Sequence, residues 1–177
     1  MRKLALSLVL LVVLSMPAGT VLAQPSAPMN FLALLSGAEE APARDTLARG
    51  AAVFQSNPDG TVLGFRLIVA NIENVVAAHI HCGAPGVNAP VGVNLFVGGA
   101  PGSGAFNGVL AEGVITGPNP GNGCGWMTLQ DVVDAILSGG AYVNVHTNDG
   151  VDPSNTGPGD FPGGEIRGQV FLAGPDK

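Results

Sequence analysis

The chain has 177 residues, with 27 Gly and 14 Pro, and its 13 acidic residues outnumber its seven basic residues to give a net charge of −6. Nucleic acid is excluded as a favoured partner, because binding to its phosphates requires clustered basic side chains. The length fits one domain, which is large enough to bury a core without additional crosslinks.

Residues 1–23 have the composition of a secretory signal peptide. Arg2 and Lys3 precede an apolar run, and the segment ends in small residues, with Val21 and Ala23 placed for cleavage before Gln24. Cleavage leaves five basic residues against 13 acidic residues, a net charge near −8. We therefore expect a secreted or periplasmic protein with no membrane span after cleavage, and a short linker over residues 24–29.

Alternating apolar residues predict β-strands through most of the mature chain. In residues 61–70, Leu63, Phe65, Leu67 and Val69 share one face of a strand, and the NPDG turn precedes it. The same pattern predicts strands near 31–36, 49–56, 75–82, 91–97, 108–115, 141–147 and 164–172. The fold class is all-β, a single Greek-key-like β-sandwich or barrel with one short helix.

The two histidines of the predicted 75–82 strand alternate with its apolar face. His79 and His81 point to one side, and the 141–147 strand places His146 on the corresponding polar side. Imidazoles at positions i and i+2 can reach one ion, so the three histidines form a candidate copper or zinc site. The alternative is a structural hydrogen-bonded cluster that ties strand ends together.

Cys82 and Cys124 are the two cysteines of the chain, and export would place them in an oxidising compartment. A disulfide between them is the first expectation. The alternative makes Cys82 a thiolate metal ligand beside the histidines.

Apolar residues at helical spacing occur in the segment 128–139. Leu129, Val132, Val133, Ile136 and Leu137 predict one face of a helix over 129–137. The helix would begin after Thr128 as N-cap, with Asp131 in a capping-box position, and end at Gly139.

Charged residues of the last strand and of the preceding loop could serve a structural role or bind a metal ion. Glu165 and Arg167 predict an ion pair with each other or with a cross-strand neighbour, and Glu165 is also a weaker candidate as a fourth metal ligand. The acidic loop with Asp149, Asp152 and Asp160 lacks the spacing of a calcium loop, so it is expected to be solvated.

Four ordered motifs carry a family resemblance. The segments LSGAEEAP, AHIHCGAPGVNAPV, LSGGAYVNVHT and GGEIRGQV resemble the CHRD domain first named in chordin, over residues 30–173. The resemblance implies an extracytoplasmic β-sandwich module of a kind that, in chordin, belongs to a protein that binds secreted growth factors.

The HIH stretch is also similar to the copper-binding strand of copper/zinc superoxide dismutase. That paired-metal centre needs more histidines than this chain possesses, so a dismutase is not expected.

Motifs of nucleophilic catalysis, phosphate loops and dinucleotide binding are absent from the sequence, which places an enzyme behind a binding module. We expect an exported interaction module with a protein or cell-envelope partner, and copper or zinc is the candidate cofactor. The alternative is a mononuclear copper- or zinc-binding protein, with a redox role open, that uses His79, His81 and His146. Its affinity would fall as pH drops through about 6 to 7, where free imidazoles protonate.

Overall fold

A computed structural model describes residues 27–174, which form an antiparallel β-structure with one α-helix. The predicted signal peptide, residues 1–23, lies outside the described residues, as do the first residues of the predicted linker. The strands are β1 (Asn30–Ser36), β2 (Arg49–Ser56), β3 (Leu63–Glu73), β4 (Val75–His81), β5 (Val91–Val97), β6 (Ala105–Ile115), β7 (Tyr142–Thr147), β8 (Ile166–Gln169) and β9 (Phe171–Leu172).

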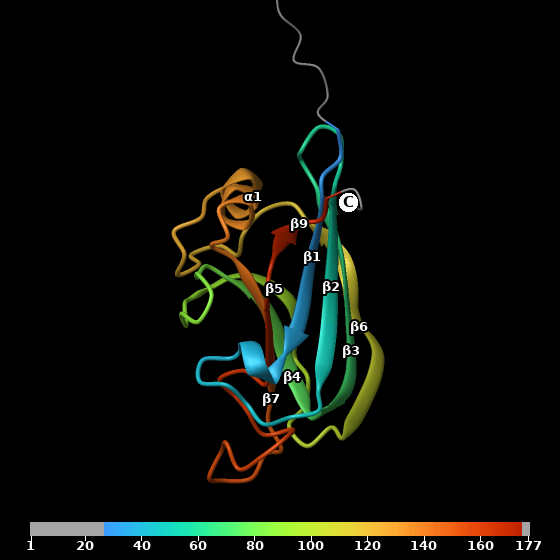
Figure 1. Ribbon diagram of the computed structural model, residues 1–177, viewed down its shortest axis with the longest axis vertical. Coiled ribbons are helices and arrows are strands. Elements are labelled where there is room, and N and C mark those ends of the chain that lie inside the picture. Colours follow the sequence, from blue (N-terminus) through green and yellow to red (C-terminus); the bar gives the residue numbers. More distant parts are fainter. Residues whose placement is uncertain (1–26, 175–177) are drawn as a thin grey trace, which may run out of the picture.

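The strands follow a Greek-key-like path around a nearly closed sheet. Their spatial order is β5-β4-β7-β8-β1-β2-β3-β6, and β9 pairs with β1 outside that path. The chain leaves β3 for the β4–β5 hairpin on the other side and then returns to pair β6 with β3. Figure 1 shows β1, β2, β3 and β6 along one side of the molecule and β4, β5 and β7 along the other. The predicted fold class is confirmed.

Alternation along the strands builds an apolar core between the two sides. In β3, Leu63, Leu67 and Val69 are buried, whereas Arg66 and Ile68 face outward, as the period-two pattern predicts. From the opposite side, β4 and β7 contribute buried apolar side chains to the same cluster. This burial supplies the main apolar contribution to folding, at about 25 cal/mol per Å² removed from water.

The helix α1 (Leu129–Leu137) has the predicted bounds and the predicted cap. The Thr128 hydroxyl accepts the backbone N–H of Asp131, and the Asp131 carboxylate accepts the backbone N–H of Thr128, so both donors of a capping box are satisfied. Gly139 has φ +73° and lies just beyond the helix end. Among residues 27–174, no helix is both long and apolar enough to cross a membrane.

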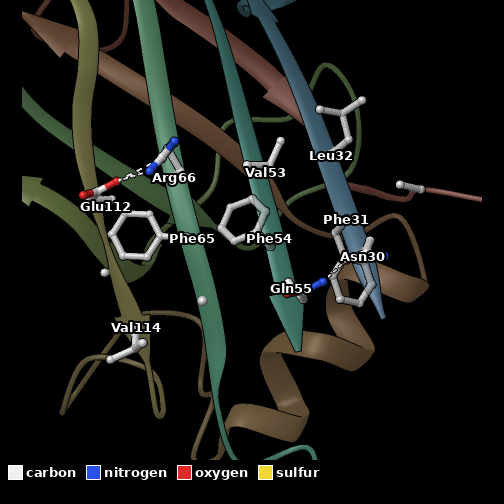
Figure 2. Close-up of a pocket in the computed structure, with 13 residues that line it drawn as sticks. Asn30, Phe31, Leu32, Val53, Phe54, Gln55, Phe65, Arg66, Glu112 and Val114 are labelled. Atoms are coloured by element: carbon white, nitrogen blue, oxygen red, sulfur yellow. Dashed lines mark hydrogen bonds and ion pairs between the residues drawn. The ribbon is translucent and has the colours of Figure 1, made fainter. Parts of the chain in front are cut away.

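The two outer faces of the sheet differ in what covers them. The outer face of β1, β2, β3 and β6 is open, and a groove runs along it (Figure 2). The polar outer face of β4, β7 and β8 is instead covered by loops, including the loop after η1 (Gly37–Glu39) and the loop after Cys82. The sequence pattern places these polar side chains on the outward side of the strands. Loops nevertheless cover them, because backbone and side-chain atoms of the loops form hydrogen bonds with them.

Candidate functional site

Strands β4 and β7 bring the three histidines together on their covered polar face. The two strands are antiparallel neighbours, with Ala77 opposite His146 and His79 opposite Asn144. Because side chains alternate along a strand, His79 and His81 share a face, and His146 projects from the same face of the next strand. His81 is 7% exposed, and His79 and His146 are partly buried.

Three imidazole nitrogens converge in this cluster. His79 Nδ1 lies 3.1 Å from His146 Nε2. One nitrogen from each of the three rings lies within 4.8 Å of the other two. In a tetrahedral site with metal–nitrogen bonds of 2.0–2.1 Å, donor nitrogens lie about 3.3 Å apart. The His79–His146 pair already has about this separation, and the other nitrogen–nitrogen distances, which lie within 4.8 Å, would have to shorten for the three nitrogens to surround one ion.

Backbone carbonyls orient two of the rings. The Nδ1–H of His81 faces the carbonyl oxygen of Ala89 at 2.8 Å, and that of His146 faces the carbonyl oxygen of Pro162 at 2.9 Å. A ring that donates through Nδ1 carries its lone pair on Nε2, and metal-binding histidines are commonly oriented by such a hydrogen bond from the ring N–H that does not face the ion. The His81 Nε2 atom is buried and has no hydrogen-bond partner.

Burial keeps the cluster neutral. Desolvation, followed by repulsion from His146 and His81, lowers the pKa of His79 to about 4. Desolvation also lowers the pKa of His81 to about 4 and shifts that of His146 downward. The pKa of each of the three imidazoles therefore lies below the ordinary histidine value, which favours the neutral form that can donate to a metal ion.

Glu165 lies on the same side of the sheet but is fully occupied by other contacts. Its Oε1 accepts from the Thr46 hydroxyl at 2.6 Å, and its Oε2 accepts from the Thr147 hydroxyl at 2.7 Å and from the Gly159 N–H at 2.9 Å. The carboxylate therefore joins the loop before β2 to the loop after β7. It does not belong to the group of converging ligand atoms.

Arg167 stacks beneath the histidines. Its guanidinium lies 3.4 Å from the centre of the Tyr142 ring, and the Tyr142 ring stacks on His81 at 4.9 Å. The guanidinium donates to the carbonyl oxygens of Val87 and Ala84 in the loop between β4 and β5. Arg167 thus supports the loop that orients His81.

The predicted ion pair between Glu165 and Arg167 does not form. The ion pair recorded between described residues joins Arg66 and Glu112, with 2.8 Å between Nη2 and Oε2. Glu165 and Arg167 are 0% and 1% exposed, so each is held by hydrogen bonds to the covering loops and not by a partner on the surface.

Sequence reasoning missed Glu40, which lies beneath the loops near this face. The side chain is 7% exposed and its Oε1 has no hydrogen-bond partner. Desolvation raises the pKa of Glu40 to about 7, against smaller opposing effects of Arg167 and Arg44. The sequence carries no signal that separates Glu40 from its neighbour Glu39, although Glu39 is exposed and Glu40 is buried.

We expect Glu40→Gln to gain stability relative to the native chain as pH rises. The folded chain holds the Glu40 proton up to about pH 7, whereas the unfolded chain releases it near 4.5, so native stability is lost between these values. The glutamine variant does not titrate at this position, so it avoids the decrease of about 3 kcal/mol in the free energy of unfolding that the native chain undergoes over this pH range. Urea unfolding of both proteins at pH 4.5 and pH 8 measures the difference.

The neighbouring substitution Glu39→Gln is the matched control, since Glu39 is exposed. Its stability relative to the native chain should not change over the same pH range. A stability difference between Glu40→Gln and the native chain that is constant with pH would contradict the role assigned to Glu40.

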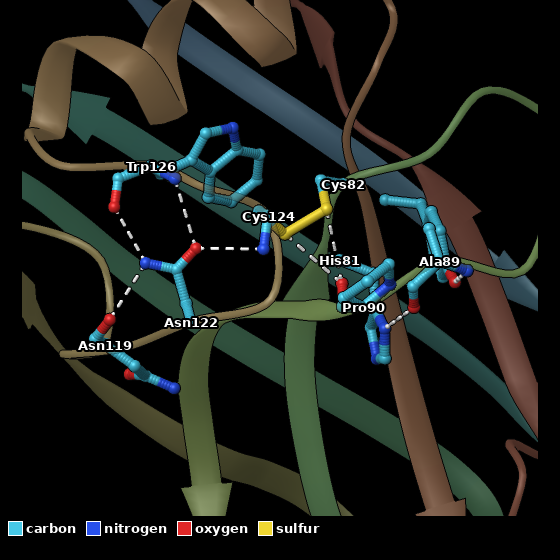
Figure 3. The surroundings of a disulfide bond; sticks show 9 residues. His81, Cys82, Ala89, Pro90, Asn119, Asn122, Cys124 and Trp126 are labelled. Atoms are coloured by element: carbon cyan, nitrogen blue, oxygen red, sulfur yellow. Dashed lines mark hydrogen bonds between the residues drawn. A yellow bond between two sulfur atoms is a disulfide. The ribbon is translucent and has the colours of Figure 1, made fainter.

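The disulfide Cys82–Cys124 is formed, which confirms the pairing and removes Cys82 from the metal ligands. Figure 3 shows it next to Pro90, Ala89 and His81, and both sulfur atoms lie near the Pro90 carbonyl oxygen. The disulfide fixes the Cys82 end of the segment that carries the Ala89 carbonyl, and the backbone N–H of Cys82 donates to the Pro90 carbonyl oxygen at its other end. The disulfide joins this segment to the loop in which Asn122 bridges Asn119 and Trp126.

The acidic loop after β7 uses its side chains to stabilise turns. Asp160 accepts from the backbone N–H and the hydroxyl of Thr156, and Asp149 accepts from the Val151 N–H. Within residues 27–174, the histidines alone form a group of three or more converging ligand atoms.

Comparison with known protein families gives one match. The model of the family described as CHRD domain matches residues 31–170. Neither the curated proteins nor the solved structures provide a match to this chain. The matched range begins in β1, ends after β8 and includes all three histidines and both cysteines.

Proposed function

Because the chain belongs to the CHRD domain family, we propose that it is exported and acts as a secreted or periplasmic interaction module. Family membership supports an extracellular-type binding module, and the disulfide is consistent with an oxidising compartment. The leader-like composition of residues 1–23 adds the export step. Its partner would be a protein or another component of the cell envelope.

Export can be tested on the protein recovered from cells. We expect an extracytoplasmic protein whose chain begins at Gln24 and whose two cysteines resist thiol labelling before reduction. The matched control carries a charged residue in the apolar leader, Leu10→Arg, and should remain in the cytoplasm with reactive thiols. Cytoplasmic retention of the unaltered chain with an intact leader would contradict the proposal.

A second binding function is favoured by the convergence of imidazole nitrogens. The hydrogen bonds to Ala89 and Pro162 leave His81 Nε2 and His146 Nε2 with lone pairs. His146 Nε2 accepts from His79 Nδ1, so an ion would replace this hydrogen bond, with the His79 proton moving to Nε2 and Nδ1 becoming the third donor. Three neutral nitrogen donors fit copper or zinc better than hard cations such as calcium, which take oxygen ligands. We propose that these three residues bind one divalent copper or zinc ion.

The residues have distinct roles in this site. His79, His81 and His146 would hold the ion, while Ala89 and Pro162 fix two ring orientations through their carbonyl oxygens. When bound, an ion with three protein nitrogens keeps a position that can accept water or another small ligand. Tyr142 and Arg167 support His81 from behind and do not need to contact the ion.

Calorimetric titration of the metal-free protein with copper and zinc salts tests the site. We expect saturable binding of one ion, and His81→Ala or His146→Ala should weaken it by more than the roughly 10–100-fold that loss of an outer-shell partner costs. Binding should persist at pH 5.5, because the pKa values of His79 and His81 are lowered to about 4, and should fall as pH drops through that value.

The acidic loop provides matched controls. Asp149→Ala and Asp152→Ala should leave the affinity unchanged, since these carboxylates lie outside the histidine cluster. Binding no tighter than about 10 μM at pH 7.5, or binding unaffected by loss of His81, would assign the histidines to a structural cluster. That dissociation constant corresponds to about 7 kcal/mol of binding free energy.

A further inference from the structure

The open outer face of β1, β2, β3 and β6 carries an apolar row that crosses four strands. Leu34 lies opposite Ala51, Ala51 opposite Ile68, and Ile68 opposite Val109. Leu34 is 61% exposed, and Ile68 and Val109 are 41% and 45% exposed. Exposed faces of antiparallel sheets ordinarily carry polar side chains, so a contiguous apolar row marks an interaction surface.

The rows on both sides of this apolar row carry charge. One contains Arg49, whose guanidinium donates to the backbone carbonyls of Thr46 and Ala48, and the other contains one charge of each sign. The latter row runs Leu32, Val53, Arg66, Glu112 in register, and the last two form the surface ion pair (Figure 2). One positive and one negative charge side by side leave this row neutral. The chain as a whole has a net charge of −6, so a basic partner would be attracted to other parts of its surface. The paired charges of this row would give such a partner no additional attraction.

A groove of about 890 Å³ lies beside these rows. Gly64 contributes no side chain to it, which leaves a depression between Gln55 on β2 and Val114 on β6. Val114 is 68% exposed and projects at the edge of the groove. The same face therefore offers both protruding apolar side chains and a depression that can receive them.

We propose that this face, defined by Leu32, Leu34, Val53, Arg66, Ile68, Val109, Glu112 and Val114, is the contact between two copies of the chain. Two copies stacked face to face would bring two Arg66 and two Glu112 side chains into one cluster of balanced charge. A closed two-fold contact of this kind uses the same patch on both copies, so the patch must complement itself. Sheets pack face to face about 10 Å apart, a distance that apolar side chains of this length fill.

The size of the face sets the strength of the contact. Four strands about 4.8 Å apart and seven residues long at about 3.3 Å per residue give a face of roughly 440 Å². Two such faces bury about 900 Å² in total, which is below the roughly 1,200 Å² of stable complexes. The dimer should therefore be weak, with a dissociation constant in the micromolar range or above.

Sedimentation equilibrium of the exported protein up to about 1 mM tests the contact. The native chain should show a reversible monomer–dimer equilibrium. Arg66→Glu alone and Glu112→Arg alone should each be monomeric, because each would place four like charges in the interface. An equimolar mixture of these two variants should restore dimerisation, since two negative side chains of one then face two positive side chains of the other.

Two controls separate this contact from general charge effects and from misfolding. Glu39→Arg makes the same charge change as Glu112→Arg at an exposed site away from this face, and it should dimerise like the native chain. Ile68→Thr keeps the β-branched shape and should weaken the dimer about fivefold or more through loss of buried apolar area. A native chain that remains monomeric at 1 mM, or a variant mixture that remains monomeric, overturns the proposal.

Discussion

Glu165→Ala should lower the free energy of unfolding by about 5 kcal/mol, through loss of three hydrogen bonds to a buried carboxylate. The Thr46 and Thr147 hydroxyls and the Gly159 N–H all donate to this group, which is 0% exposed. Removal of the carboxylate leaves two buried donors and the partly buried Thr46 hydroxyl without their acceptor, and it disconnects two loops from each other. Urea unfolding monitored by far-ultraviolet circular dichroism measures the loss.

Two other substitutions serve as comparisons for the loss of stability expected from Glu165→Ala. Glu165→Gln preserves the shape and one acceptor, and the threonine hydroxyls can rotate to accept from its amide, so it should cost less than half as much. Glu112→Ala removes an exposed carboxylate from a surface ion pair and should cost less than about 1 kcal/mol. If Glu165→Ala is no more destabilising than Glu112→Ala, the carboxylate does not hold the loops.

Loss of the Cys82–Cys124 disulfide should cost about 4 kcal/mol. The bond closes a loop with a sequence separation of 42 residues, and chain entropy of the unfolded state predicts a stabilisation of about this size. The double variant Cys82→Ala/Cys124→Ala avoids free thiols, and its unfolding midpoint in urea can be compared with that of the native chain. Its slope against urea should rise somewhat, because the unfolded chain without the crosslink is more extended and exposes more surface.

Reduction of the native chain gives an independent measurement of the same quantity. Treatment with dithiothreitol should shift the unfolding midpoint of the native chain to that of the double variant, and it should leave the double variant itself unchanged. Equal midpoints for the oxidised native chain and the double variant would contradict a stabilising role for the disulfide.

Local patterns predicted the helix and most of the strands. The single strand expected near 164–172 is instead two strands, β8 and β9, and Phe65, expected on the buried face of β3, is only partly buried. The alternation of Leu63, Leu67 and Val69 identifies the buried face of β3, and the Thr128–Asp131 pair marks the start of α1. Both signals arise from contacts within a few residues or from a simple inside–outside rule, which the sequence carries directly. The count of two cysteines in a chain with a leader-like start was likewise enough to predict their pairing.

The same alternation predicted that the three histidines share a face, but it could not predict that the face is covered. Burial of Arg167 depends on the carbonyl oxygens of Ala84 and Val87, and burial of Glu165 depends on Thr46, which is 119 residues away in sequence. Loops that cover a sheet have no periodic pattern, so their position is invisible to reasoning from periodicity. The error in the predicted Glu165–Arg167 ion pair has this origin.

Glu40 illustrates the same limit for electrostatics. Two adjacent glutamates look equivalent in sequence, yet one is exposed and the other has a raised pKa, because only the tertiary structure decides which carboxyl loses its water. The pKa values of the histidines could not be predicted from the sequence for the same reason.

The path of the sheet has a mechanical consequence. The strand order ends at β5 on one side and β6 on the other, so β6 pairs with β3 alone and β5 with β4 alone. The sheet is therefore not a closed barrel, and β5 and β6 are its two edge strands. Local opening costs least where a strand has one neighbour, so fraying should start at these edge strands while β7, flanked by β4 and β8, remains paired. Of the two histidine-bearing strands, β4 borders an edge strand, whereas β7 is separated from that edge strand by β4 and should loosen later.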